Sequence, residues 1–133
     1  MAHIDVAPYR AFWRKRAQAK PTPDMLKAME AARSEAQRLA KILAEEFGVQ
    51  RVYLFGSFAW GIDVNTASDV DLAAEGLPPG KLIAADIHLS DASLYSVDLV
   101  RLEHLPSPLR DLIMKSGVLL YDKPKDDSRA VAS

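Results

Sequence analysis

Two short motifs in the middle of the chain carry side chains suited to phosphate and metal chemistry. Gly56 and Ser57 follow the apolar run 52–55, and Asp69 and Asp71 are separated by one valine. A glycine after a buried strand lets backbone N–H groups and the serine hydroxyl approach an anion, because no Cβ blocks it. Two carboxylates two positions apart on a strand share a face and repel, so we expect a cation between them. Ligation by oxygen alone favours Mg²⁺ or Mn²⁺.

A third carboxylate, Asp98, stands inside the apolar stretch 94–102, which predicts a strand. An unpaired buried carboxylate costs several kcal/mol or loses its charge, so its position needs a reason. Beside the Asp-Val-Asp motif, we favour a third carboxylate that faces the metal. The alternatives are a salt bridge to Arg51 or Arg101 and a solvent-exposed position on an alternating strand.

A long amphipathic helix is expected to precede the first motif. Thr22 is a candidate N-cap, Pro23 fits the first helical position, and Gly48 would end the helix. We expect its apolar face to pack against a sheet rather than to bind a ligand. The residues of this face recur every three or four positions: Met25, Met29, Ala32, Ala36, Leu39, Leu43 and Phe47.

The rest of the chain alternates short strands and short helices. Ser107 and Pro108 are expected to cap the last helix, and Gly117 to end it. In the helix before it, the inward positions are Leu82, Ala85 and Leu89. Strands are predicted at 49–55, 68–73, 94–102 and 118–121, one helical turn at 58–61, and a helix at 81–89.

Composition restricts the class of protein. The chain has 133 residues, a formal net charge of −1 and an estimated pI of 6.3, which predicts one domain and gives no global argument for nucleic-acid binding. The absence of cysteine excludes disulfides and thiolate metal sites. No apolar run reaches the roughly 18 residues of a membrane span, and the N-terminus lacks a signal-peptide core. A cytoplasmic location without membrane association is therefore expected.

The two ends of the chain differ from its middle. Residues 1–21 interleave arginine and lysine with aromatic side chains and predict a basic amphipathic helix or arm. We favour packing of its aromatic face on the domain, and leave open a docking arm for RNA, a nucleotide or an acidic partner. Residues 22–122 are the expected catalytic domain, and the polar tail 123–133 is expected to be flexible.

The order of the motifs resembles a known family. Gly-Ser, eleven intervening residues, Asp-Val-Asp and a later Asp98 in a strand are similar to the DNA polymerase β-like nucleotidyltransferase superfamily. The short length and the segments GSFAWG, SDVDL and VDLVRL resemble its minimal nucleotidyltransferases, the MNT proteins, over about residues 28–121. Each motif alone is a weak signal, but both in this order between strands are fairly specific.

The resemblance implies a fold and a reaction. The fold is α/β (α+β), with a small mixed β-sheet and helices packed mainly on one face. The reaction is the transfer of a nucleoside monophosphate from a nucleoside triphosphate with the help of two Mg²⁺ ions, or of Mn²⁺ in their place.

The resemblance also assigns residues to this reaction. The implied nucleotide-binding residues are Gly56, Ser57 and Ser68, the first two at the triphosphate. Asp98 would also accept or orient the proton of the attacking hydroxyl. The implied catalytic and metal-binding residues are Asp69, Asp71 and Asp98.

MNT proteins serve as antitoxins of HEPN-type RNase toxins, in some cases by adding AMP to a tyrosine of the toxin. The resemblance thus implies ATP as the nucleotide and a HEPN-type protein as the partner and acceptor. One residue departs from the family pattern: Trp60 stands where arginine is common, and tryptophan brings no charge to a phosphate. Arg51 or the N-terminal cations could replace that charge.

Two other hypotheses remain open. Transfer to a small molecule, as in aminoglycoside adenylyltransferases, is weakened by the lack of an extra helical domain. A weakly catalytic or non-catalytic binding module with this fold would neutralise its partner by complex formation. Trp60 supports this module, and the three intact aspartates oppose it.

Overall fold

The computed structural model describes residues 20–62, 64–65 and 67–124 as a four-stranded mixed sheet with helices packed against it. In the sheet, β1 is antiparallel to both β2 and β4, whereas β2 and β3 are parallel. The strand order is β3-β2-β1-β4. The strands are β1 (Arg51–Phe55), β2 (Val70–Glu75), β3 (Val97–Arg101) and β4 (Val118–Asp122). The expected α/β (α+β) mixed sheet is confirmed.

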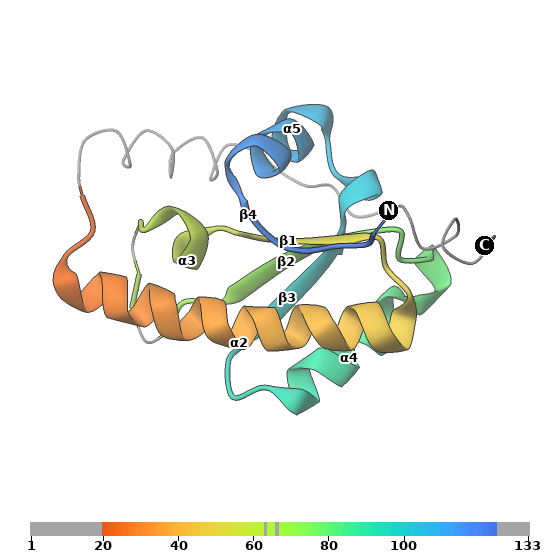
Figure 1. Ribbon diagram of the computed structural model, residues 1–133, viewed down its shortest axis with the longest axis horizontal. Helices are drawn as coiled ribbons and strands as arrows, with labels where there is room; N and C mark the ends of the chain where they lie inside the picture. The colour runs from red at the N-terminus through yellow and green to blue at the C-terminus, as the bar shows by residue number, and fades with distance from the viewer. Residues whose placement is uncertain (1–19, 63, 66, 125–133) are drawn as a thin grey trace.

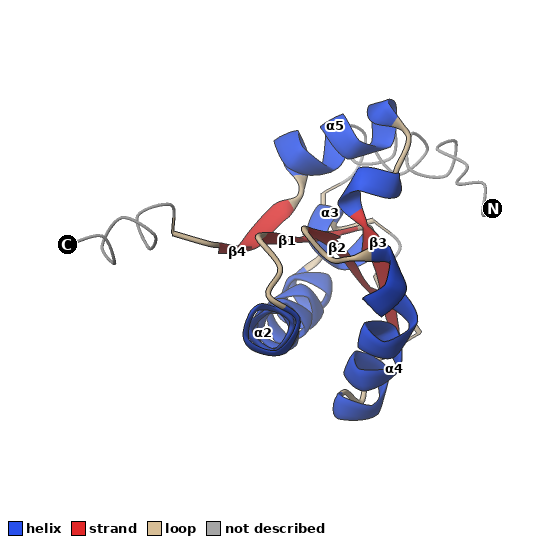
Figure 2. Ribbon diagram, turned by 90° about the vertical axis from the view of Figure 1, so that its right-hand side faces the viewer, coloured by secondary structure: helices blue, strands red, loops and turns tan. Residues whose placement is uncertain are grey.

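The two longest helices lie on one face of the sheet, and the third lies on the other side (Figures 1 and 2). They are α2 (Pro23–Phe47), α4 (Leu82–Ala92) and α5 (Ser107–Ser116), respectively. The single turn α3 (Ser57–Trp60) directly follows β1, and two 3₁₀ turns cover Pro79–Lys81 and Leu102–His104. The described helices include none that is long and apolar enough to cross a membrane.

The long helix α2 begins and ends where its sequence predicts. The Thr22 hydroxyl accepts a hydrogen bond from the backbone N–H of Met25 at 3.1 Å, and Gly48 ends the helix in the left-handed conformation, with φ 64°. Its inward face is buried against the sheet, as expected. The fully buried positions are Met29, Ala32, Ala36, Leu39, Ala40 and Leu43.

Several predicted boundaries are wrong. The strands predicted at 49–55 and 94–102 are Arg51–Phe55 and Val97–Arg101, and the helix predicted at 81–89 runs to Ala92. The second strand begins at Val70, not at residue 68, because Ser68 belongs to a turn in which its N–H bonds the Asn65 carbonyl at 3.1 Å. In α5 the N-cap position is Pro106, and Ser107 is already helical. The Ser107 hydroxyl instead accepts from Arg110, at 3.1 Å.

The predicted N-terminal helix or arm (1–21) and the predicted flexible tail (123–133) fall almost entirely on residues 1–19 and 125–133; of the tail's two described residues, Lys123 donates its backbone N–H to the Gln50 carbonyl at 2.8 Å. Residues 1–19 and 125–133 lie outside the described residues, so these two predictions are left as they stand.

Candidate active site

Gly56 turns the chain at the end of β1, where only glycine fits. Its backbone has φ 80° and ψ −153°, a combination that other residues rarely adopt. A Cβ added at this position would overlap Oδ2 of Asp71 and lie 3.1 Å from its Cγ. The missing side chain therefore makes room for the carboxyl group of Asp71.

The sheet register brings two of the predicted carboxylates together. Asp71 on β2 pairs with Phe55 on one side and with Asp98 on the other. Because laterally paired residues point to the same face of a sheet, the two aspartates lie side by side. Leu72 and Leu99, one position further on, pair with each other and are buried on the opposite face.

Asp69 joins this pair from the loop before β2. It is exposed, whereas Asp71 is half-buried. Burial, and then the negative charges of Asp98 and Asp69, raise the pKa of Asp71 to about 7. The pKa of Asp98 is also raised, first by burial and then by Asp86 and Asp69. The charge of Asp69 therefore acts on both of the paired aspartates.

Asp86 is a fourth carboxylate that the sequence analysis missed. It projects from α4 toward β3, where the backbone N–H of Leu99 bonds to it, and burial raises its pKa. Its Oδ1 atom is buried and, within the described residues, has no hydrogen-bond partner. One signal in the sequence indicates its side of the helix, though not its contact with Asp98: Asp86 is four residues after Leu82, which was expected to point inward.

The carboxylates of this site are of the type that binds an oxygen-preferring divalent cation, but their side chains are not yet arranged around one. Clustered carboxylates with raised pKa values repel one another, and a cation would relieve this repulsion. In the part of the chain that the structure describes, however, no group of three His, Cys, Asp or Glu side chains is arranged to hold a metal ion. The chemistry of the donor set fits Mg²⁺, and its side chains would have to rotate to enclose the ion.

Comparison with known families shows to which family this arrangement of motifs belongs. The family model "Polymerase beta, Nucleotidyltransferase" matches residues 37–126, which include both motifs and all four carboxylates. The chain belongs to this family. No curated protein matches the chain at a significant level.

Solved structures with the same fold include toxin–antitoxin complexes. A mutant MntA–HpeT pair aligns with a TM-score of 0.56 and 26% identity over 71% of this chain and 77% of that chain. A toxin–antitoxin structure with AMP-PNP aligns with a TM-score of 0.55 and 24% identity over 75% and 81%. A tri-AMPylated HEPN toxin of Shewanella oneidensis in complex with its MNT antitoxin aligns with a TM-score of 0.50 and 22% identity over 76% and 78%.

The two serines of this nucleotidyltransferase domain differ in their surroundings. Ser57 is half-buried and begins α3, directly after Gly56. Ser68 holds the loop before Asp69, since its hydroxyl accepts from the backbone N–H of Asn65 at 3.0 Å. Ser57 is therefore placed at the Gly-Ser corner, as predicted, while the Ser68 hydroxyl has a structural bond within its own loop.

Neither Trp60 nor Arg51 is placed to contact a phosphate at the nucleotidyltransferase site, because Trp60 is buried and Arg51 lies at the other end of β1. The Trp60 side chain is only 2% exposed, and its indole N–H donates to the Ser116 carbonyl at 3.1 Å, which ties α3 to the end of α5. Arg51 is at the far end of β1, about 13 Å from Phe55 by strand geometry, and pairs with Glu75 and Asp122. The suggestions that Arg51 replaces a phosphate-binding charge or pairs with Asp98 are wrong. Within the described residues Arg101 does not pair with Asp98 either, since its Nε donates to the Leu77 carbonyl at 2.8 Å.

Proposed function

We propose that this nucleotidyltransferase transfers AMP from ATP to a hydroxyl group, a tyrosine of a HEPN-type toxin partner, and thereby acts as its antitoxin. The observation that carries the proposal is the convergence of Asp71 and Asp98 in one sheet register, with Asp69 close enough to raise both pKa values. Family membership supports nucleotidyl transfer as the reaction. Two solved structures with this fold suggest the partner. One is an MNT antitoxin in complex with a tri-AMPylated HEPN toxin, and the other is a toxin–antitoxin structure with AMP-PNP.

The proposed step exchanges one phosphorus–oxygen bond for another. The acceptor oxygen bonds to the α-phosphorus of ATP, the bond from that phosphorus to the β-phosphate bridging oxygen breaks, and pyrophosphate leaves. The proton of the acceptor hydroxyl passes to the carboxylate of Asp98. Asp98 is suited to this role because it lies on the edge strand β3 and its side chain is only partly covered, so a protein acceptor can approach.

Two Mg²⁺ ions would be held by Asp69, Asp71 and Asp98. When bound, they would neutralise the triphosphate and stabilise the charge that develops on the attacking and leaving oxygens. The other proposed contacts belong to the Gly-Ser corner. Gly56 keeps the backbone beside Asp71 free of a side chain, and Ser57 offers its hydroxyl to the triphosphate.

The test is transfer of label from ATP to a HEPN-type partner purified with this chain. ATP labelled at the α-phosphate should label the partner in the presence of Mg²⁺, and ATP labelled at the γ-phosphate should not. The Asp69→Asn/Asp71→Asn variant should lose the transfer, while Asp111→Asn, which removes an exposed carboxylate on α5, should retain it. Label that arrives from the γ-phosphate, or equal transfer by the aspartate variant, would refute the proposal.

A non-catalytic binding module is the second candidate. It is favoured by one observation: the described carboxylates are not already arranged as a three-ligand metal site. In that case the Asp69→Asn/Asp71→Asn variant would neutralise the toxin as fully as the unchanged chain, and without any nucleotide.

A further inference from the structure

The helix α4 is apolar on its outer face as well as on the face that packs against the sheet. Ala85 and Leu89 are buried, whereas Ile83 and Ile87, one turn apart on the opposite side, are 74% and 57% exposed. A surface helix ordinarily carries polar side chains on its outer face. The long helix α2 follows this rule, because most of its exposed positions are polar, among them Lys27, Glu30, Lys41 and Glu45. The outer face of α4 therefore has the composition of a surface that another molecule covers.

A third exposed apolar residue stands in the chain between α4 and the strand that carries Asp98. Leu94 is fully exposed, and it lines a hollow of about 250 Å³ together with Ser68, the residue before Asp69. Single exposed apolar residues are ordinary, but of the six large ones in the described part of the chain, three lie at 83–94. We call this group of three the α4 ridge: Ile83, Ile87 and Leu94.

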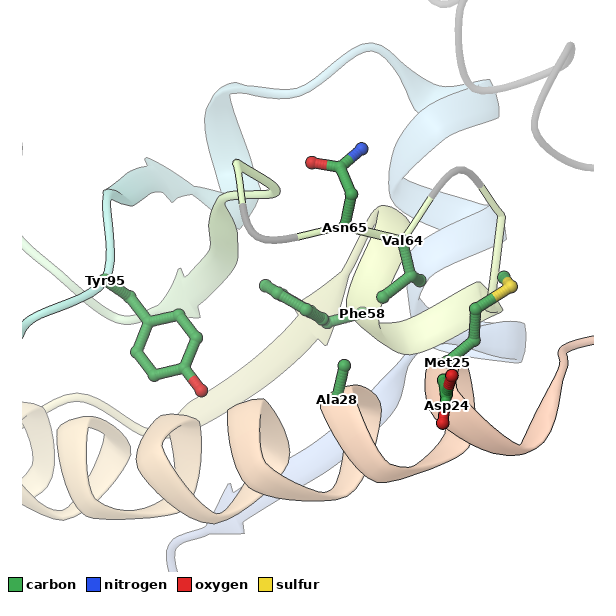
Figure 3. A pocket seen from close by; sticks show the side chains of 7 residues that line it. All are labelled: Asp24, Met25, Ala28, Phe58, Val64, Asn65 and Tyr95. Atoms are coloured by element: carbon green, nitrogen blue, oxygen red, sulfur yellow. The ribbon is translucent and has the colours of Figure 1, made fainter.

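The segment that carries Leu94 is held against α2. The side chain of the neighbouring Tyr95 points toward α2 and lines a cavity of about 460 Å³, which the start of α2, the turn α3 and the loop at 64–65 also line (Figure 3). Its ring is perpendicular to that of Phe58, with the centroids 5.8 Å apart. The Ser93 hydroxyl accepts from the backbone N–H of Tyr95 at 3.1 Å and donates to Glu35 on α2 at 2.6 Å. Leu94 is thus presented by an ordered turn, so a partner that covers it orders little additional chain.

The α4 ridge borders the edge of the sheet at which the acceptor is proposed to arrive. The helix α4 packs along the edge strand β3 (Figure 2), and its Asp86 accepts a hydrogen bond from the backbone N–H of Leu99, the residue after Asp98. A stable protein interface covers about 20–30 residues of each partner. A protein whose hydroxyl group reaches Asp98 from this edge would therefore also meet α4.

The charges near the ridge restrict the kind of molecule that covers it. Residues 82–100 include no lysine or arginine but three aspartates, and the exposed Asp91 is one helical turn beyond Ile87. A symmetric pair of chains joined through this face would bring like charges together, which opposes a second copy as the occupant. A partner with lysine or arginine side chains around an apolar patch would complement both the ridge and the carboxylates.

We propose that the α4 ridge is the surface on which the HEPN-type partner docks, through an apolar patch flanked by lysine or arginine side chains. The ridge holds the partner at the edge of β3, from which its acceptor hydroxyl reaches Asp98. This inference rests on the proposed function, because it names the surface through which the acceptor of that reaction is recognised.

The first test replaces apolar groups on the ridge without changing the shape of the side chains much. Ile83→Thr/Ile87→Thr keeps β-branched residues at exposed positions, so the fold should be retained, as thermal unfolding will show. Leu119→Thr is the matched control, because Leu119 is exposed on β4 at the opposite edge of the sheet. Calorimetric titration with the separated HEPN-type partner should give a Kd at least tenfold higher for the ridge variant and an unchanged Kd for the control. Leu94→Ser should weaken binding in the same direction.

The second test observes the ridge in the unchanged chain. The isoleucine methyl groups are labelled with ¹³C, and the HEPN-type partner is added. The signals of Ile83 and Ile87 should shift on binding, whereas Ile113, which is buried under α5, is the internal control and should stay in place. Dilution of the chain alone should leave all of these signals unchanged.

The outcomes separate this inference from the proposed function. Equal affinity of the partner for the unchanged chain and for Ile83→Thr/Ile87→Thr would overturn the docking surface, and label transfer from ATP would then still support the reaction. Binding that depends on the ridge but transfers no label would support the surface and refute AMP transfer. Absence of any binding to the HEPN-type partner would refute both. Shifts of Ile83 and Ile87 on dilution of the chain alone would overturn the proposal in favour of a second copy.

Discussion

The two ends of the central strand pair β1–β2 differ in how their charged side chains are paired. At one end Arg51 pairs with Glu75 at 2.7 Å and with Asp122 at 3.1 Å. At the other end Asp71 lies beside Asp98 and, within the described residues, makes no ion pair with a lysine or arginine. The first end is compensated and contributes modestly to stability, whereas the second end accumulates like charges that favour a cationic ligand.

The largest effect is expected from a substitution at the end of the sheet that carries Asp71 and Asp98. Asp71→Asn should reduce nucleotidyl transfer by at least about 100-fold, because it removes a carboxylate from the region where transition-state charge is balanced. The rate of label transfer from ATP measures the effect. Retention of more than a tenth of the activity would show that Asp71 is not part of the catalytic set.

The same residue gives the second-largest effect, on stability and its pH dependence. The native pKa of Asp71 is about 7, above its ordinary value of 3.8, so between about pH 4 and 7 the native state binds a proton that the unfolded state has lost. The free energy of unfolding of the metal-free protein should therefore fall as the pH rises through this range, by up to about 4 kcal/mol from this group. Urea unfolding at several pH values in the presence of a chelator measures it.

Asp71→Asn is the control for that pH dependence. The variant should lose the part of the slope that Asp71 contributes and should be more stable than the unchanged chain at alkaline pH. Parallel pH profiles for the two proteins would contradict the assigned cause.

The third test concerns the glycine that lies against Asp71. Gly56→Ala should destabilise the protein by about 3 kcal/mol, because it combines a strained backbone with an overlap on the Asp71 carboxyl group. Gly48→Ala is the matched control: its φ is also positive, at 64°, but an added Cβ meets nothing within 4 Å, so about 1 kcal/mol is expected. Equal losses of unfolding free energy in urea would mean that contact with Asp71 is unimportant.

The smallest effect is expected at the compensated end. Arg51→Met should lower the free energy of unfolding only slightly, by less than either glycine variant, and leave nucleotide transfer unchanged, because both of its ion pairs are partly exposed. Urea unfolding and the transfer assay together measure it. A large loss of activity would show that the two ends of the sheet are coupled.

Signals in the sequence predicted much of the fold. The helix α2 follows its caps Thr22 and Gly48, and the mixed sheet places Asp71 beside Asp98 as the motif order implied. The caps and the apolar face of α2 depend on neighbouring residues and on apolar periodicity, which the sequence displays directly. The pairing of Asp71 with Asp98 is non-local, and it was implied by the family resemblance.

Features that depend on tertiary packing were not predicted. Asp86 acts on Asp98 only because α4 packs along β3, and the spacing of the two residues in the chain does not indicate it. Trp60 was interpreted as a lost phosphate ligand, whereas it is a core residue with a bond to the end of α5. The cavity beside Tyr95 is formed by four separate segments of the chain, so no single motif could predict it.

The parallel pairing of β2 with β3 also has a consequence for how the protein folds. Antiparallel pairing of β1 and β2 brings Gly56 to Asp71, but Asp98 arrives only when the crossover through α4 is complete. Docking of β3 is therefore the step that brings like charges together, and such non-local pairings are slow to form. In metal-free buffer, refolding after a jump out of urea should accelerate as the pH is lowered from about 8 to about 5, and Asp98→Asn should remove much of this acceleration. Equal acceleration in the two proteins would place the like-charge contact after the rate-limiting step.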